Sequence, residues 1–191
     1  WYLRGFDVGV AARTFARSLA FHPNMLLDLL AVRRSMESDL VEQSVAHLTP
    51  RDLAILAELA DRMHWRATRG ESFPVEDAEF HRRLIAASGN LVALALIDLY
   101  FGVIEVLYQH GFPGPAPDDL VTVAQGHGEI VAALVRGDAP AASHALRTSH
   151  NDESQRRFSA WRDAHPISVD GNGIHPVQAA IQAALLWPGL R

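Results

Sequence analysis

Residues 77–90 read DAEFHRRLIAASGN, and this stretch joins a helical segment to a clear helix end. Asp77 and His81 are four residues apart, which places a carboxylate and an imidazole on one helical face, one turn apart. The Ser-Gly-Asn that follows predicts a helix end at Gly89 and the N-cap of the next helix at Asn90. The stretch therefore predicts two consecutive helices and part of a polar site.

Helical spacing of apolar residues extends over most of the chain. Thr49, Pro50 and Asp52 form a helix start, and Gly137 with Asp138 marks a junction between two helices. No pair of strands is evident, so we predict an all-α, antiparallel bundle of six to seven helices. The expected helices cover about residues 25–45, 50–63, 75–87, 91–108, 118–135, 139–161 and a short terminal segment, 177–186.

The composition excludes several classes of function. The 191 residues are 49% hydrophobic and 20% charged, which suits one globular domain with an appendage at one end. The formal net charge of -5 disfavours a surface for nucleic acid on this chain. Because cysteine is absent, a metal site would depend on His, Asp or Glu, and a cytoplasmic location is the default expectation.

The longest apolar run, residues 91–106, contains Asp98 and Glu105. We interpret this run as too short and too charged for a membrane span, and we expect no membrane partner. The chain starts at Trp1 rather than Met, from which we expect that an N-terminal part precedes it.

Two later histidines extend the polar site that starts at Asp77 and His81. His127 has apolar neighbours at helical spacing, which predicts a buried imidazole, and His150 falls on the helix after it. Three nitrogens and one carboxylate oxygen suit a divalent transition metal such as Zn, Ni or Mn. By spacing alone, Asp77 and His81 also fit a surface ion pair, and His127 also fits a ring bonded to a carbonyl.

The order of these motifs resembles the C-terminal ligand-sensing (FCD) domain of the FadR subfamily of GntR transcription regulators. The likeness covers roughly residues 25–160 and includes RRSME at 33–37, TPRDL at 49–53, the stretch at 77–90, HGEIVAAL at 127–134 and GD at 137–138. It implies a helical bundle with an internal cavity, often with a divalent metal at its base and a small organic acid above the metal. It also implies a homodimer that binds DNA through a winged-helix domain ahead of the sensor.

The resemblance also assigns roles to individual residues. Asp77, His81 and His127 match metal ligands of the family. The family's last histidine falls on Ser149, and His150 comes one residue late, which turns the side chain by about 100° around the helix. His150 is therefore a fourth ligand only if the helix register shifts.

Two further residues are candidates for binding the effector. Arg33 matches a position where the family keeps an arginine that faces the cavity, and a guanidinium pairs well with a carboxylate. Asn90, at the Ser-Gly-Asn boundary, is the second candidate.

We therefore predict three regions: a linker or remnant of a winged-helix domain (1–24), the ligand-sensing bundle (25–164), and a C-terminal loop with a short helix (165–191). The predicted function is the effector-binding and dimerisation domain of a bacterial transcription regulator, without enzymatic activity, that senses a small carboxylate. A metal-dependent, hydrolase-like enzyme stays open because three ligands leave a coordination position for water. A metal-free helical dimerisation module stays open because of Ser149.

Overall fold

The structure, a computed structural model, describes residues 7–19, 25–109 and 117–148. These ranges hold seven helices and no strand, which confirms the predicted all-α class. The helices are α1 (Val8–Leu19), α2 (Met25–His47), α3 (Pro50–Ala67), α4 (Pro74–Ala86), α5 (Leu91–Gln109), α6 (Pro117–Val135) and α7 (Ala139–Thr148).

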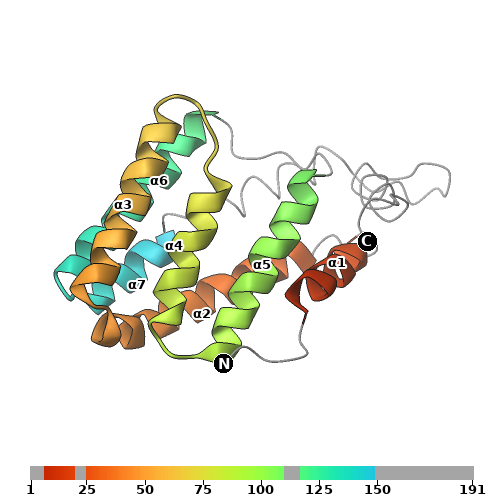
Figure 1. Cartoon of the computed structure of the whole chain (residues 1–191), viewed down its shortest axis with the longest axis horizontal. Helices are drawn as coiled ribbons and strands as arrows, with labels where there is room; N and C mark the ends of the chain where they lie inside the picture. The colour runs from red at the N-terminus through yellow and green to blue at the C-terminus, as the bar shows by residue number, and fades with distance from the viewer. Residues whose placement is uncertain (1–6, 20–24, 110–116, 149–191) are drawn as a thin grey trace.

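The helices form a bundle in which α4 lies between two packed pairs (Figure 1). Helix α3 packs against α6 on one side of α4, and α1 packs against α5 on the other side. Helix α2 crosses the bundle and contacts α4, α5 and α7. This arrangement brings side chains of α2, α4, α5 and α6 together at one polar site.

The predicted helix boundaries at 49–52 and 88–90 are confirmed by their hydrogen bonds. The Thr49 hydroxyl accepts from the amide of Asp52 at 3.2 Å, and the Asp52 carboxylate accepts from the amide of Thr49 at 2.9 Å, which is a complete capping box. Asn90 caps α5 because its Oδ1 accepts from the amides of residues 92 and 93. Gly89 has φ +73°, a left-handed conformation that favours glycine at a helix end.

The main core lies between α3, α4, α6 and α7. Its fully buried side chains include Leu56, Met63, Phe80, Leu84 and Ile130. Phe80 and Leu84 are one turn apart on α4, so this helix directs a continuous apolar stripe into the core. The same orientation fixes the positions of Asp77 and His81, which lie beside that stripe.

Helix α1 is a feature that the sequence did not predict. The segment 1–24 was expected to be a linker or a remnant of a winged-helix domain, and no helix was expected in it, but Val8–Leu19 is helical and its Ala12 is buried against α5. The close approach depends on Gly102, where an added Cβ would lie 3.0 Å from the Cβ of Ala12. The predicted terminal helix over 177–186 lies outside the described residues.

Helix α5 corrects the expectation that the apolar run at 91–106 is too short for a membrane span. The helix continues to Gln109, and its window Leu91–Tyr108 has a mean hydropathy of 2.1, so it is long and apolar enough to span by length and composition. Core helices of soluble proteins meet the same criteria, but only 28% of this window is buried. Leu91, Val92 and Leu96 are exposed, so α5 presents an apolar face.

Candidate metal centre

Asp77, His81 and His127, which the sequence singles out, converge on one point. Asp77 and His81 extend from neighbouring turns of α4, and His127 reaches them from α6. The Asp77 Oδ1 lies 2.9 Å from His127 Nε2 and 3.4 Å from His81 Nε2. Both imidazoles are fully buried, whereas the Asp77 side chain is 25% exposed. One ligand atom from each residue lies within 4.8 Å of the other two.

The partners at Nδ1 indicate which nitrogen of each ring carries a proton. The Nδ1 of His127 lies 3.0 Å from the carbonyl oxygen of Val123, which only accepts, so this nitrogen donates. The Nδ1 of His81 lies 3.1 Å from a carboxylate oxygen of Glu37, which also only accepts when it is ionised. In a neutral ring the proton at Nδ1 leaves a lone pair at Nε2. Both rings therefore present their Nε2 lone pairs toward Asp77.

This geometry fits a cation. The lone pairs of Asp77 Oδ1 and of the two Nε2 atoms face one another over short distances, and they repel unless a proton or a metal ion lies between them. Transition metals bind imidazole nitrogen and carboxylate oxygen at about 2.0–2.2 Å, so a shared ion needs only small side-chain adjustments. The donor atoms, two imidazole nitrogens and one carboxylate oxygen, suit a Zn, Ni or Mn ion.

Aromatic packing holds the two imidazoles in place. The Phe80 ring packs edge to face against His127, with a centroid distance of 4.8 Å, and against His81 at 5.4 Å. Phe73 and Phe101 contact the outer sides of His127 and His81. Rings that are fixed by packing on several sides lose little further freedom when they bind a ligand.

A second charged group lies directly behind His81. Arg33 and Glu37, one turn apart on α2, are both buried, and the Arg33 Nε donates to the Glu37 Oε1 at 3.0 Å. The Arg33 guanidinium also lies over the rings of Tyr100 and Phe101 on α5, at 4.4 and 4.8 Å from their centroids. The Arg33 Nη2 and the Glu37 Oε2 are buried and have no hydrogen-bond partner among the described residues.

The protonation states follow from these contacts. Burial alone would raise the pKa of Asp77, but hydrogen bonds and positive charge from His127 and His81, present when a ring carries a proton at Nε2, outweigh burial and hold the pKa well below its ordinary value. Burial lowers the pKa of His127. Burial would also lower the pKa of His81, but the neighbouring Glu37 carboxylate reverses that effect and raises it. His127 is therefore the neutral ring, and His81 is the ring that takes up a proton more readily.

The buried ion pair on α2 is charged. Burial alone would lower the pKa of Arg33, and the Glu37 carboxylate instead raises it. Burial alone would raise the pKa of Glu37, and the charges of Arg33 and His81 instead lower it. Burial raises the pKa of Tyr100, whose hydroxyl stays neutral.

Asn90 is not brought to this cluster. Asn90 is exposed, and its side-chain oxygen already caps α5, so its effector role stays a prediction. Ser149 and His150 lie outside the described residues.

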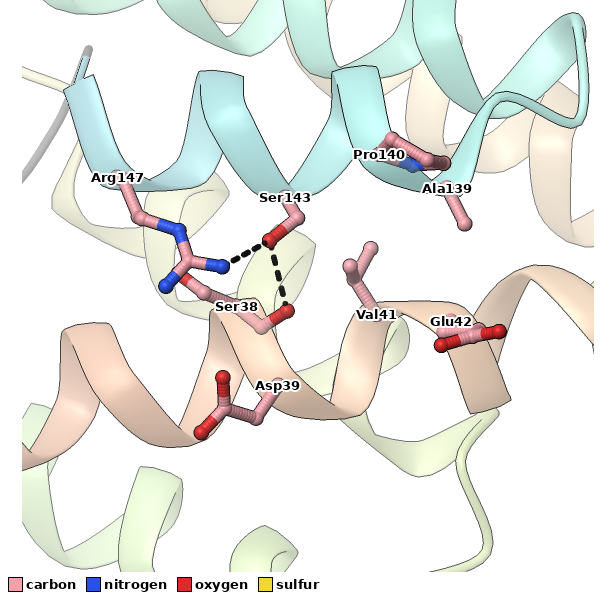
Figure 2. Close-up of a pocket in the computed structure, with 8 residues that line it drawn as sticks. All are labelled: Ser38, Asp39, Val41, Glu42, Ala139, Pro140, Ser143 and Arg147. Atoms are coloured by element: carbon pink, nitrogen blue, oxygen red, sulfur yellow. Dashed lines mark hydrogen bonds between the residues drawn. The ribbon is translucent and has the colours of Figure 1, made fainter.

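A pocket of about 300 Å³ lies elsewhere, between α2 and α7, as Figure 2 shows. Ser143 spans this pocket, because its hydroxyl donates to the Ser38 carbonyl oxygen and accepts from Arg147. None of the predicted site residues within the described ranges lines the pocket, so the predicted internal cavity stays a prediction.

Sequence reasoning missed Glu37. It falls inside the RRSME stretch that supported the family resemblance, but no role was expected for it. The available signal was its spacing, because Glu37 follows Arg33 by four residues and lies between apolar positions of the same helix. That pattern is equally typical of a solvated helix pair, and only the packing of α2 against α4 distinguishes the two cases.

Comparisons with known proteins agree with this architecture. A family model described as "FCD domain" matches residues 28–151, more than half of the chain. The HTH-type transcriptional repressor NanR of Edwardsiella tarda (strain FL6-60) is 27% identical over 161 residues, which cover 82% of this chain and 58% of the relative. The chain thus spans less than two thirds of that relative's length.

A solved structure shows a similar fold. E. coli McbR/YncC superposes with a TM-score of 0.57 at 20% sequence identity, over 70% of this chain and 64% of the other. The order of helices, the match over residues 28–151 and the predicted family resemblance thus agree. The chain belongs to the FCD domain family.

Proposed function

We propose that this chain is the effector-binding and dimerisation domain of a GntR-type bacterial transcription regulator, and that it senses a small organic acid beside a divalent metal. Membership of the FCD family and a relative that is an HTH-type transcriptional repressor support the regulator assignment. DNA binding is assigned to a winged-helix domain outside this chain. A cytoplasmic location and the absence of enzymatic activity follow from the same assignment.

The proposed metal ligands are Asp77, His81 and His127, with His150 as a fourth candidate. When bound, a divalent ion supplies positive charge beside Asp77 and a coordination position for an oxygen of the effector. The protein's own contribution is orientation, because the carbonyl of Val123 and the carboxylate of Glu37 hold the two Nδ1–H groups away from the site.

The proposed acid-binding residue is Arg33. Its guanidinium lies over the rings of Tyr100 and Phe101, and its Nε donates to Glu37. Its Nη2 has no hydrogen-bond partner among the described residues. A buried donor without a partner costs about 1–3 kcal/mol, which a carboxylate oxygen of a ligand would recover. Placing Arg33 next to the metal ligands favours a small acid that contacts both.

The observation that carries this proposal is that Asp77, His81 and His127 each bring one potential metal-ligating atom to the same place. Glu37, which contacts His81, also contacts the buried guanidinium of Arg33. Zinc titration of metal-free protein, followed by calorimetric titration of the zinc-loaded protein with a panel of small carboxylic acids, tests it. We expect zinc uptake and binding of at least one acid. His81→Ala should abolish both, and His144→Ala, at an exposed histidine of α7, should change neither.

Two outcomes would contradict the proposal. Wild-type protein that takes up neither zinc, nickel nor manganese and shows no thermal shift with them would support the metal-free dimerisation module. Steady turnover of esters or acids by the metal-loaded protein would instead support the hydrolase-like enzyme.

The homodimer is supported by the apolar face of α5. Leu91, Val92 and Leu96 are 57%, 67% and 39% exposed, on a helix that is otherwise strongly apolar. Contiguous exposed apolar surface on a protein domain usually marks an interaction site. We propose that a second copy of the chain covers this face.

A further inference from the structure

We propose that Glu37 is a positioning residue, which orients His81 toward the metal site and links that site to Arg33. The inference rests on the proposed function, because it concerns the same metal ligands and the same acid-binding arginine. It adds a residue from α2 to a site whose proposed ligands come from α4 and α6.

The inference starts from a continuous line of contacts through three helices. The Glu37 Oε1 accepts from the Arg33 Nε at 3.0 Å and lies 3.1 Å from the His81 Nδ1. The opposite nitrogen of the same ring, Nε2, lies 3.4 Å from the Asp77 Oδ1, which in turn is 2.9 Å from His127. One carboxylate oxygen of Glu37 therefore contacts both the arginine and the histidine.

Burying the charged carboxylate of Glu37 destabilises the fold unless that charge interacts favourably with neighbouring groups. Glu37 is fully buried, and a leucine or methionine would fill the same volume without the desolvation penalty. Neutralising Arg33 accounts for only part of the arrangement, because Glu37 also faces an imidazole that has its second nitrogen at the metal site.

The two histidines differ in the group that holds Nδ1–H. His127 donates to the neutral carbonyl of Val123, whereas His81 faces the charged carboxylate of Glu37. A carboxylate at this place fixes the tautomer with the lone pair at Nε2, and it makes the ring a stronger ligand than a carbonyl does. Glu37 therefore makes His81 the more basic of the two imidazole ligands.

The shared oxygen also links metal binding to acid binding. An acid that pairs with Arg33 draws guanidinium charge away from Glu37, which leaves more of the carboxylate charge for His81. Binding of the acid should then strengthen metal binding, and by thermodynamic reciprocity binding of the metal should strengthen acid binding by the same factor.

Zinc titration of the metal-free protein tests the inference, with Glu37→Gln compared with Glu42→Gln. Gln keeps the shape of Glu37 but removes the charge, and we expect zinc affinity to fall about 10–100-fold. Glu42 is exposed on the same helix, and its substitution should leave zinc affinity unchanged. A folded Glu37→Gln variant that binds zinc as tightly as the wild type would overturn the proposal.

The tautomer of His81 gives a second readout that needs no variant. Nitrogen NMR of the metal-free wild type, at a pH where the ring is neutral, should show the proton on Nδ1 of His81. A proton on Nε2 would overturn the proposal even if Glu37→Gln does not fold. Wild-type protein that takes up no zinc would refute the proposed metal site, and the tautomer alone would then decide whether Glu37 orients His81.

Discussion

The residues around Asp77 show how a buried polar cluster can be consistent with a stable fold. Two carboxylates, two imidazoles and a guanidinium come from three helices; Glu37 pairs with Arg33 and His81, and Asp77 pairs with the two rings once a proton or a metal ion lies between them. Buried charges are tolerated under this condition, and removing one partner then exposes the full cost of desolvating the other. The consequences are therefore measurable with single substitutions.

The ion pair of Arg33 and Glu37 gives the first prediction at this scale. Arg33→Met and Glu37→Met should each lower the free energy of unfolding by about 3–5 kcal/mol, because each leaves one buried charge without its partner. The double variant should lose clearly less than the sum of the two, since both charges are gone. Urea denaturation of the four proteins measures this coupling, and strictly additive losses would show that the two charges do not interact.

The pKa of His81 predicts how metal binding depends on pH. Glu37 raises this pKa above the ordinary value of 6.5, so at neutral pH a proton competes for the Nε2 lone pair. Zinc affinity should therefore increase as the pH rises from 6 to 8, and binding should release protons. Calorimetric titration in buffers of different ionisation enthalpy measures both effects, and an affinity independent of pH over this range would contradict the raised pKa.

At the scale of helices, the boundaries depend on a few residues with specific backbone or side-chain requirements. The capping box at Thr49 and Asp52 and the cap at Asn90 satisfy amides that a helix start leaves without partners. Asp52 has a lowered pKa because Thr49 donates to its carboxylate, so its stabilising effect is present above the ordinary pKa and is lost as the pH falls through the lowered one.

Substitution by alanine should have opposite effects on stability at Gly89 and at Gly128. Gly89→Ala should destabilise the protein by about 1–2 kcal/mol, because residue 89 has φ +73°. Gly128→Ala should stabilise it by about 0.5–1 kcal/mol, because Gly128 lies inside α6 with open space around its Cβ position. Thermal unfolding of both variants tests this pair, and stabilisation by Gly89→Ala would contradict the left-handed turn between α4 and α5.

At the scale of the whole molecule, α5 connects the buried site to the surface. Tyr100 of this helix lies against Arg33, and Leu96, one turn before Tyr100, belongs to the exposed apolar residues of the same helix. A change at the site that moves α5 would therefore reach the proposed dimer interface. Effector binding can change a distant interface only through an element that contacts both places and has two arrangements with different affinities for the effector.

The dimer prediction can be tested at Leu96. Leu96→Lys places a charge in the proposed interface and should shift the protein toward monomer in sedimentation experiments, with little change in helical content. Trp65→Lys is the matched control, since Trp65 is also apolar and exposed but lies on α3. An unchanged dimer in Leu96→Lys would move the interface to another surface.

Sequence reasoning predicted much of the fold because its signals are local. Residue 89 needs glycine, Thr49 caps its own helix, and Asp77 and His81 share a face by the geometry of a helix alone. It missed helix α1, whose apolar residues pack against α5 only because Gly102 permits the approach. It placed α5 correctly, at about residues 91–108, but misjudged the apolar length of this helix, whose window Leu91–Tyr108 is long enough to span by length and composition.

The sequence by itself determined the all-α class, the capped boundaries and the shared helix face of Asp77 and His81, because hydrogen bonds and side-chain spacing within one helix act over a few residues. Tertiary structure alone decided that His127 meets Asp77 across 50 positions of chain, and that Glu37 lies behind His81. These pairings depend on which faces of α2, α4 and α6 pack together. That choice minimises exposed apolar area over the whole bundle, and no short stretch of sequence contains it.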